Sequence, residues 1–463
     1  MIWTPETGAL DLKSLRTLYA GGKITPVDVV NAIHDRIAAR GDDGVWITLP
    51  GREDSIARAK AVMARGTHQT LPLYGVPFGI KDNFDLEGVA TTMAVPAWSR
   101  IAETSSPTIT TLIEAGAIPI GKQNMDQLGM GLVGVRTGYT VPACVFDDAY
   151  ISGGSSSGGA VSVAANLVSF ACANDAAGSG RVPAALNNIV GYKPTPGLVP
   201  RLGRSVAGMV GSDNFLTLNI ADAVTLSNLW FRYDPEDPFS KPAAATFHLS
   251  LADEIAPFRF AVPDAASIDF DGDAEAERLF FENVARLETL GGTRVEIDIS
   301  PYLTAARLLY EGPYIAQRYA NFGPRMEQDP TALHPATAKI LSWGRQYSAA
   351  DLFEVQYRMG RYVQMSRALF RDIDVLVTPT SPSTYTIADM QRDNIALNAK
   401  MGTYTNFVNL LDLPAVSIPA GFRADGKSLG TMLIGPSLGD GDILNLGAAL
   451  HTALDIAPGL RVA

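Results

Sequence analysis

Hydrophobic and polar residues alternate with two different periods along this chain, and each period indicates a type of element. In residues 1–65, apolar side chains such as Val30, Ile33 and Ile37 recur every three or four positions, which predicts helices. The preceding segment 25–28, Thr-Pro-Val-Asp, has the composition of a capping box with proline in the first turn. We expect this helical part to pack against the main body and to carry no chemistry.

Short apolar runs bounded by glycine and proline predict buried strands farther along. The first of them ends at Lys81. A helix is expected over residues 107–115, with Ser106 as N-cap and Gly116 as the stop. Strands are predicted at 73–80, 117–122, 258–263, 375–380, 413–419 and 430–435, and helices at 273–291 and 302–318.

This succession of strands and helices predicts an α/β fold, a large mixed β-sheet sandwiched between layers of α-helices. We expect a single domain over residues 1–463. Within it, 66–200 forms the catalytic core, and 201–463 supplies the rest of the sheet and the substrate-binding helices. The helix predicted over 302–318 places Tyr310 and Arg318 two turns apart on one face, a pattern that is most often a solvated surface.

Two clusters of glycine and serine, at 152–158 and 177–181, bracket the apolar run 160–173. A lone GGSSSGG sequence is typical of a flexible linker. Here the cluster leads directly into an apolar segment, whereas linkers join solvated ones. Glycine allows close approach of the backbone to a ligand, and neighbouring hydroxyls can supply a nucleophile and a proton relay. The pattern therefore favours a catalytic site.

Lys81 and the loop 124–136 each allow two interpretations. A lysine at the end of a strand is usually a solvated charge, but burial beside hydroxyls would lower its pKa and make it a general base. The glycine-rich loop either lines a pocket or only connects two elements. It lacks the GxxxxGK[ST] pattern of a phosphate-binding loop.

Composition and charge limit the partners, the cellular compartment and the cofactors that we expect. The net charge of −11, with no basic tract, argues against nucleic acid as a partner. Two cysteines form no disulfide framework and suit a reducing cytosol. We find neither a secretion signal nor a stretch apolar enough to cross a membrane, so we expect a cytoplasmic protein. The five histidines lack metal-binding spacing, and no metal or other cofactor is expected.

The chain resembles the amidase signature family in LYGVPFGIKDN at 73–83, in both Gly/Ser clusters, and in GTYTNFVNLLDLPAVSIPAG at 402–421. The resemblance implies a Ser–cis-Ser–Lys triad. Ser179 would be the nucleophile, Ser155 the bridging serine on a cis peptide bond, and Lys81 the base. It also implies an oxyanion hole from the backbone of Ala176, Ala177 and Gly178.

Within that family, the chain is similar to the allophanate hydrolase branch in residues 124–127, 131–134, 175–191 and 309–313. This resemblance implies hydrolysis of the terminal carboxamide of a small urea derivative, allophanate or guanylurea, with release of ammonia. It implies that Tyr310 and Arg318 hold a substrate carboxylate, and it suggests a homodimer. The residues expected to bind substrate are Tyr310, Arg318, Gly131, Gly154 and Arg181.

Three departures from the family pattern stand out. Ala176 replaces the usual threonine, segment 137–140 is TGYT where a Ser-Pro-Tyr-Gly type is expected, and no C-terminal decarboxylating domain is expected. Two alternatives remain: a glutamine amidotransferase A-type subunit for misacylated tRNA, which needs partner subunits, and a catalytically dead small-molecule binding protein.

Overall fold

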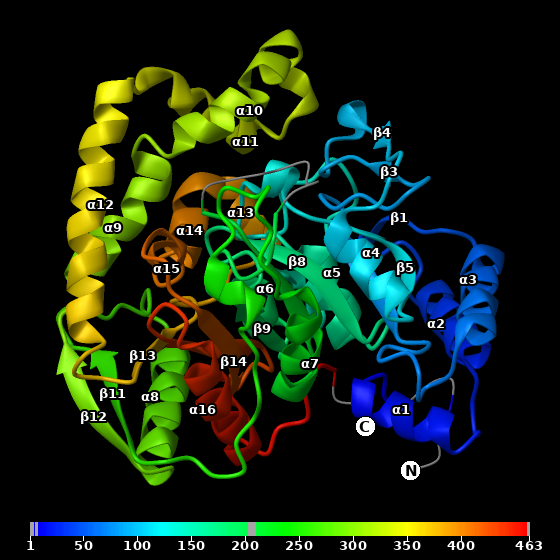
Figure 1. Ribbon diagram of the computed structural model, residues 1–463. Helices are drawn as coiled ribbons and strands as arrows, with labels where there is room; N and C mark the ends of the chain where they lie inside the picture. Colours follow the sequence, from blue (N-terminus) through cyan, green and yellow to red (C-terminus); the bar gives the residue numbers. More distant parts are fainter. Residues whose placement is uncertain (1–3, 5–7, 202–209, 461–463) are drawn as a thin grey trace.

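One mixed sheet of eleven strands runs through the computed structural model, which describes residues 4, 8–201 and 210–460 (Figure 1). Helices cover the sheet, as the sequence predicts. In spatial order the strands are β1 (Trp46–Thr48), β5 (Ile118–Gln123), β2 (Pro77–Lys81), β8 (Phe170–Asp175), β10 (Ser212–Thr217), β9 (Val190–Lys193), β14 (Ala415–Phe422), β15 (Ser428–Ile434), β13 (Val375–Pro379), β11 (Phe258–Pro263) and β12 (Gly292–Ile297). Two short ribbons pair β3 (Ala90–Thr91) with β4 (Arg100–Ile101) and β6 (Ala143–Cys144) with β7 (Asp147–Ile151).

The helices of the first half and of the second half gather on different sides of the molecule (Figure 1). The first half contributes α1 (Leu12–Ala20), α2 (Pro26–Arg40), α3 (Arg52–Arg65), α4 (Pro107–Glu114), α5 (Ser157–Ala164), α6 (Arg181–Leu186) and α7 (Ile220–Trp230). The second half contributes α8 (Ala274–Thr289), α9 (Ser300–Glu311), α10 (Ile315–Gln328), α11 (Pro335–Ser342), α12 (Ala349–Leu369), α13 (Ile387–Arg392), α14 (Asn394–Met401), α15 (Asn406–Leu410) and α16 (Asp440–Ala453). No helix among the described residues is both long and apolar enough to cross a bilayer.

Local sequence signals account for many element boundaries. The capping box at the start of α2 is confirmed, since Asp28 N donates to Thr25 Oγ1 and Thr25 N donates to the Asp28 carboxylate. Helix α4 begins at Pro107 with Ser106 as its N-cap residue, as expected, but the Ser106 side chain accepts no N–H of the first turn. The Ser106 hydroxyl instead accepts the N–H of Asp85 at 2.9 Å, which ties the helix start to the loop after β2.

The prediction of a single helix over residues 302–318 is wrong, because the chain forms two helices there. Helix α9 ends at Glu311 and α10 begins at Ile315. Proline disfavours helical geometry in the residue before it, and Gly312, directly before Pro313, is extended at φ −130° and ψ −179°. Tyr310 and Arg318 therefore belong to different helices.

Parallel pairing of three strands sets the position of the site. Strand β2 lies between β5 and β8 and runs parallel to both, with Ile80 opposite Cys172. Because parallel strands share a direction, their carboxyl ends lie at the same edge of the sheet. Lys81, the last residue of β2, thus lies beside the end of β8.

A cluster of aromatic side chains packs together in this part of the sheet. The ring of Phe170 stacks on Phe78 at 5.3 Å and meets Phe215 edge-on at 5.5 Å, and the Phe215 ring lies 3.8 Å from that of Trp230 on α7. All four side chains are buried. Their packing joins β2, β8, β10 and α7 into one core.

We expect Phe170→Ala to lower the free energy of unfolding by about 3–5 kcal/mol, the usual cost of the cavity left by a buried aromatic ring. Urea denaturation measures this change. Phe353→Ala is the matched control, since that ring on α12 is 70% exposed and its loss should change stability little. Similar losses for the two variants would contradict the assignment of Phe170 to the core.

Candidate active site

Lys81 has its amine in a buried cage of oxygen atoms. Its side chain is only 1% exposed, and Nζ donates to Ser155 Oγ at 2.8 Å, Ser156 Oγ at 2.9 Å and the carbonyl oxygen of Asn174 at 3.2 Å. No carboxylate contacts this amine directly among the described residues. The lysine is therefore buried beside hydroxyls, the second of the two interpretations that its sequence position allows.

Burial lowers the pKa of Lys81 to about 7, against the charges of Asp175 and Asp126, which raise it, while Arg318 lowers it further. A neutral amine has two N–H donors and one lone pair. The Asn174 carbonyl can only accept, so it takes one N–H. The remaining N–H and the lone pair face two serine hydroxyls, and one hydroxyl must then donate its proton to nitrogen. This is the hydrogen bond of a hydroxyl to a base.

The turn from β7 into α5 presents the first serine cluster. The Gly154–Ser155 peptide bond is cis, as the family resemblance implies, and Ser155 is fully buried. A Cβ on Gly154 would lie 2.0 Å from Asp126 Oδ2, and one on Gly131 would lie 2.5 Å from the same atom. Both glycines, which we expected to bind substrate, thus leave space for the Asp126 carboxylate.

The turn from β8 into α6 presents Ser179, which is 2% exposed. The Asp175 carboxylate shapes this turn by accepting the N–H of Gly178 at 2.7 Å and that of Gly180 at 3.0 Å. The two serine turns also contact each other, since Ser156 N donates to the backbone oxygen of Ser179 at 3.2 Å. The serines 155, 156 and 179 therefore belong to one assembly.

The backbone before Ser179 differs from expectation at one position. Gly178 N–H already donates to Asp175, so it is not available to a substrate oxygen. Within the described residues, the N–H groups of Ala176, Ala177 and Ser179 have no protein acceptor. Gly178 has φ +124°, and a Cβ there would lie 2.4 Å from Thr405 Oγ1, so only glycine fits this turn.

Arg181 has a different role from the substrate binding that we expected. It is fully buried in an ion pair with Asp175, with its Nη2 at 2.9 Å from Oδ1. Its guanidinium also donates to Asn409 Oδ1, to the backbone oxygen of Thr405 and to Met432 Sδ. Burial alone would raise the pKa of Asp175, but the Arg181 charge and hydrogen bonds bring it down to about 2. Arg181 thus positions the turn that carries Ser179.

Tyr310 and Arg318 lie on separate helices, yet each acts electrostatically on the other. Burial lowers the pKa of Arg318 and raises that of Tyr310, and the Arg318 charge opposes the rise at Tyr310. Arg318 Nη1 donates weakly to the carbonyl oxygen of Leu128 at 3.5 Å, in the loop beside Ser155. The same arginine acts on Lys81. Arg318 thus links Tyr310 electrostatically to the region of the buried amine.

Asp126 and Ser156 are the main site residues that sequence reasoning missed. Asp126 accepts the N–H groups of Val133, Gly134 and Arg136 and so folds the loop 124–136 around the serine turn. This loop lines the site rather than only connecting two elements. The signals that could have indicated these two residues are the three consecutive serines at 155–157 and the aspartate at the start of the glycine-containing segment 126–134.

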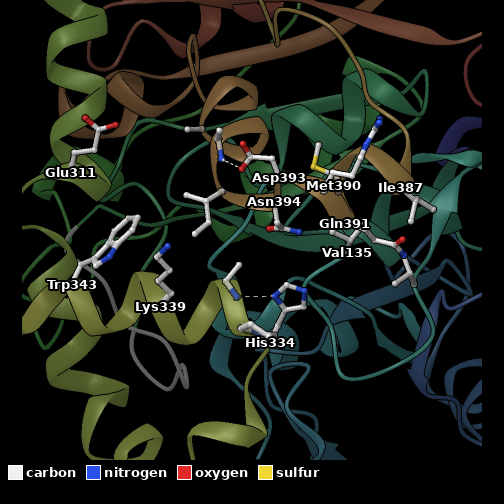
Figure 2. A pocket seen from close by; sticks show the side chains of 17 residues that line it. Val135, Glu311, His334, Lys339, Trp343, Ile387, Met390, Gln391, Asp393 and Asn394 are labelled. Atoms are coloured by element: carbon white, nitrogen blue, oxygen red, sulfur yellow. Dashed lines mark hydrogen bonds between the residues drawn. The ribbon is translucent and has the colours of Figure 1, made fainter.

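Two pockets adjoin the site without containing the lysine and serine assembly. One, of about 930 Å³, lies between α11, α13 and α14 and is lined by residues including His334, Trp343 and Asn394 (Figure 2). The second, of about 330 Å³, is lined by Tyr310, Asn398 and Asn406 among others. Among the described residues, no group of three or more His, Cys, Asp or Glu side chains could hold a metal ion.

Both the sequence and the fold match known proteins. The family model described as Amidase matches residues 28–444. The chain belongs to the amidase family. Urea amidolyase of Saccharomyces cerevisiae is 37% identical to it over 408 residues, which cover 87% of this chain and 22% of that protein. The mixed sheet flanked by helices matches the fold of solved amidase-family structures.

The structure of Kluyveromyces lactis allophanate hydrolase superimposes with a TM-score of 0.89 at 33% identity, covering 96% of this chain and 72% of that one. The chain is therefore an amidase-family hydrolase related to allophanate hydrolase. The A-type subunit of glutamyl-tRNA(Gln) amidotransferase from an Exiguobacterium species is 29% identical over 473 residues, 95% of this chain and 96% of that protein. The chain spans less than a quarter of the length of the urea amidolyases that it matches.

We expect Asp175→Asn to lower the free energy of unfolding by about 3–5 kcal/mol, because it leaves the Arg181 guanidinium buried without its counter-charge. Thermal or urea unfolding measures the loss. Glu282→Gln removes a partner of Arg278 on the exposed face of α8 and should change stability little. If the two variants unfolded at the same midpoint, the buried pair would not stabilise the Ser179 turn.

Proposed function

We propose that this protein hydrolyses the terminal carboxamide of a small urea derivative and releases ammonia, with allophanate as the favoured substrate. The observation that carries this proposal is the buried Lys81 amine in contact with Ser155 and Ser156, beside the turn of Ser179. Relationship to allophanate hydrolase supports the choice of substrate.

The first half of the reaction forms an acyl-enzyme. Ser179 Oγ attacks the carboxamide carbon while its proton passes to Ser155, and Ser155 gives its own proton to the neutral Lys81 amine. The tetrahedral intermediate then collapses. Its C–N bond breaks, and the leaving nitrogen takes the proton back through Ser155, so ammonia departs and an ester on Ser179 remains.

The second half uses water as the nucleophile. Lys81, neutral again, accepts a proton from water through Ser155, and the hydroxide oxygen attacks the ester carbon. Ser179 leaves with that proton, and the new carboxylic acid releases the second proton of the water to solvent and becomes a carboxylate. The free N–H groups of Ala176, Ala177 and Ser179 are suited to the oxyanion of both tetrahedral intermediates, and one such donor is typically worth about 3 kcal/mol.

The charges around the site favour an anionic substrate over a cationic one. Allophanate ends in a carboxylate, which the phenol of Tyr310 and the guanidinium of Arg318 would receive. Guanylurea has nearly the same shape but a cationic end, which Arg318 would repel. The two carboxylates that act electrostatically on Tyr310, Asp126 and Asp175, are engaged by backbone N–H groups, and Asp175 is also paired with Arg181.

We expect purified protein to release ammonia from allophanate much faster than from guanylurea, and Ser179→Ala to abolish this release. Arg318→Gln should raise KM for allophanate at least tenfold, because it removes one charge-assisted contact with the carboxylate. A coupled ammonia assay measures both. Faster release from guanylurea would reverse the choice of substrate.

Turnover of neither compound would contradict the proposal. Glutaminase activity that appears only with partner subunits would then support the amidotransferase alternative. A fluorophosphonate probe that fails to label the wild-type protein would support a catalytically dead binding protein.

We expect fluorophosphonate labelling of Ser179 to depend on pH with a midpoint near 7. Only the neutral amine accepts a proton, so the rate should fall about tenfold per pH unit below the pKa of Lys81 and level off above it. Arg318→Gln should move the midpoint upward, because the Arg318 charge lowers the pKa of Lys81. Labelling rates between pH 5 and 9 measure both. A pH-independent rate would exclude Lys81 as the base.

A further inference from the structure

Asn406, the first residue of α15, has a buried side-chain oxygen with no hydrogen-bond partner in the described structure. The residue is 8% exposed and lines the 330 Å³ pocket together with Tyr310. A buried amide oxygen without a partner is costly in a native protein, so it requires an explanation such as a ligand donor. Nothing in the mechanism above uses this group.

The neighbours of Asn406 place it between the two ends of the proposed substrate site. The preceding residue, Thr405, donates its hydroxyl to the backbone oxygen of Ala177 at 2.6 Å, in the turn before Ser179. On its other side, α15 packs against α9, the helix that ends beside Tyr310 (Figure 1). Asn406 thus lines a pocket with Tyr310 and directly follows the residue that contacts the Ser179 turn.

Gly402 has no side chain, and this leaves room for the Asn406 amide. A Cβ at Gly402 would lie 2.6 Å from Asn406 Nδ2 and 2.7 Å from Oδ1. Gly402 has φ −90° and ψ 0°, a conformation open to any residue, so the turn itself does not require glycine. The space at position 402 is thus occupied by the Asn406 amide.

We propose that Asn406 is a specificity-determining residue whose Oδ1 accepts the central N–H of the substrate, the group that joins the carboxamide to the carboxylate. The inference rests on the proposed function. With Ser179 at one end and Tyr310 with Arg318 at the other, the middle of a bound allophanate is this N–H. When an analogue without this N–H binds, the buried Asn406 oxygen stays without a hydrogen-bond partner. The site therefore discriminates against such an analogue.

Malonamate tests this assignment, because it keeps the carboxamide and the carboxylate of allophanate and has CH₂ in place of the central N–H. Asn406→Leu, of similar size but without the acceptor, should lower kcat/KM for allophanate about 10- to 100-fold. The kcat/KM for malonamate should stay nearly unchanged, so the preference for allophanate collapses. Steady-state ammonia release from both substrates measures the ratio.

Two further variants make the test specific. Gly402→Ala should reduce the same preference, because its methyl group displaces the Asn406 amide. Thr289→Val is the control: the exposed Thr289 hydroxyl donates to the backbone oxygen of Ala285 at the end of α8, outside this pocket, and the preference should stay at the wild-type value. Fluorophosphonate labelling of Ser179 and the melting temperature verify that each variant is folded.

Equal losses with both substrates in Asn406→Leu and Gly402→Ala would overturn the inference and assign Asn406 a purely structural role. If the wild-type protein hydrolysed allophanate and the ratio did not change in these variants, only the assignment of Asn406 would fail. If the wild-type protein hydrolysed neither substrate, the proposed function would fail and the assignment with it.

Discussion

The burial of the Lys81 amine is the constraint on which the rest of the site depends. A charged ammonium is expensive to bury without a counter-ion, and this amine contacts two hydroxyls and one carbonyl. Burial therefore favours the neutral form, which is the form that can accept a proton. The parallel pairing of β2 with β8 makes this burial possible, because it brings the end of one strand against the carbonyl groups of the other.

Two carboxylates near the amine support the site by holding backbone. Asp175 accepts N–H groups of the Ser179 turn and pairs with Arg181, while Asp126 accepts N–H groups of the loop beside Ser155. Each stays at a distance from Lys81 and moderates the fall of its pKa. The two carboxylates thus hold backbone around the site, while the amine is the group that accepts a proton.

Much of the fold could be predicted from local patterns. The strand ending at Lys81, the capped start of α2 and the helix after Asp273 follow from period, capping and glycine stops. The break at Gly312 was not predicted, because the apolar period continues across it. Pro313 is the local signal of the break. The sequence shows Asp175 six positions before Arg181, but not the partners Asn409 and Thr405, which lie more than 220 positions away and complete the burial of the guanidinium. Long-range packing decides such roles.

The break between α9 and α10 separates two tasks within one chain. Tyr310 lies in the last turn of α9, which packs against α15 and α12, whereas Arg318 belongs to the next helix, which packs with α11 at the top of the molecule (Figure 1). The hydroxyl and amine assembly is carried by the sheet and its adjoining turns. Because the Arg318 charge also lowers the pKa of Lys81, a change of sequence in α10 would alter the basicity of the buried amine even though α10 contributes no backbone to that assembly.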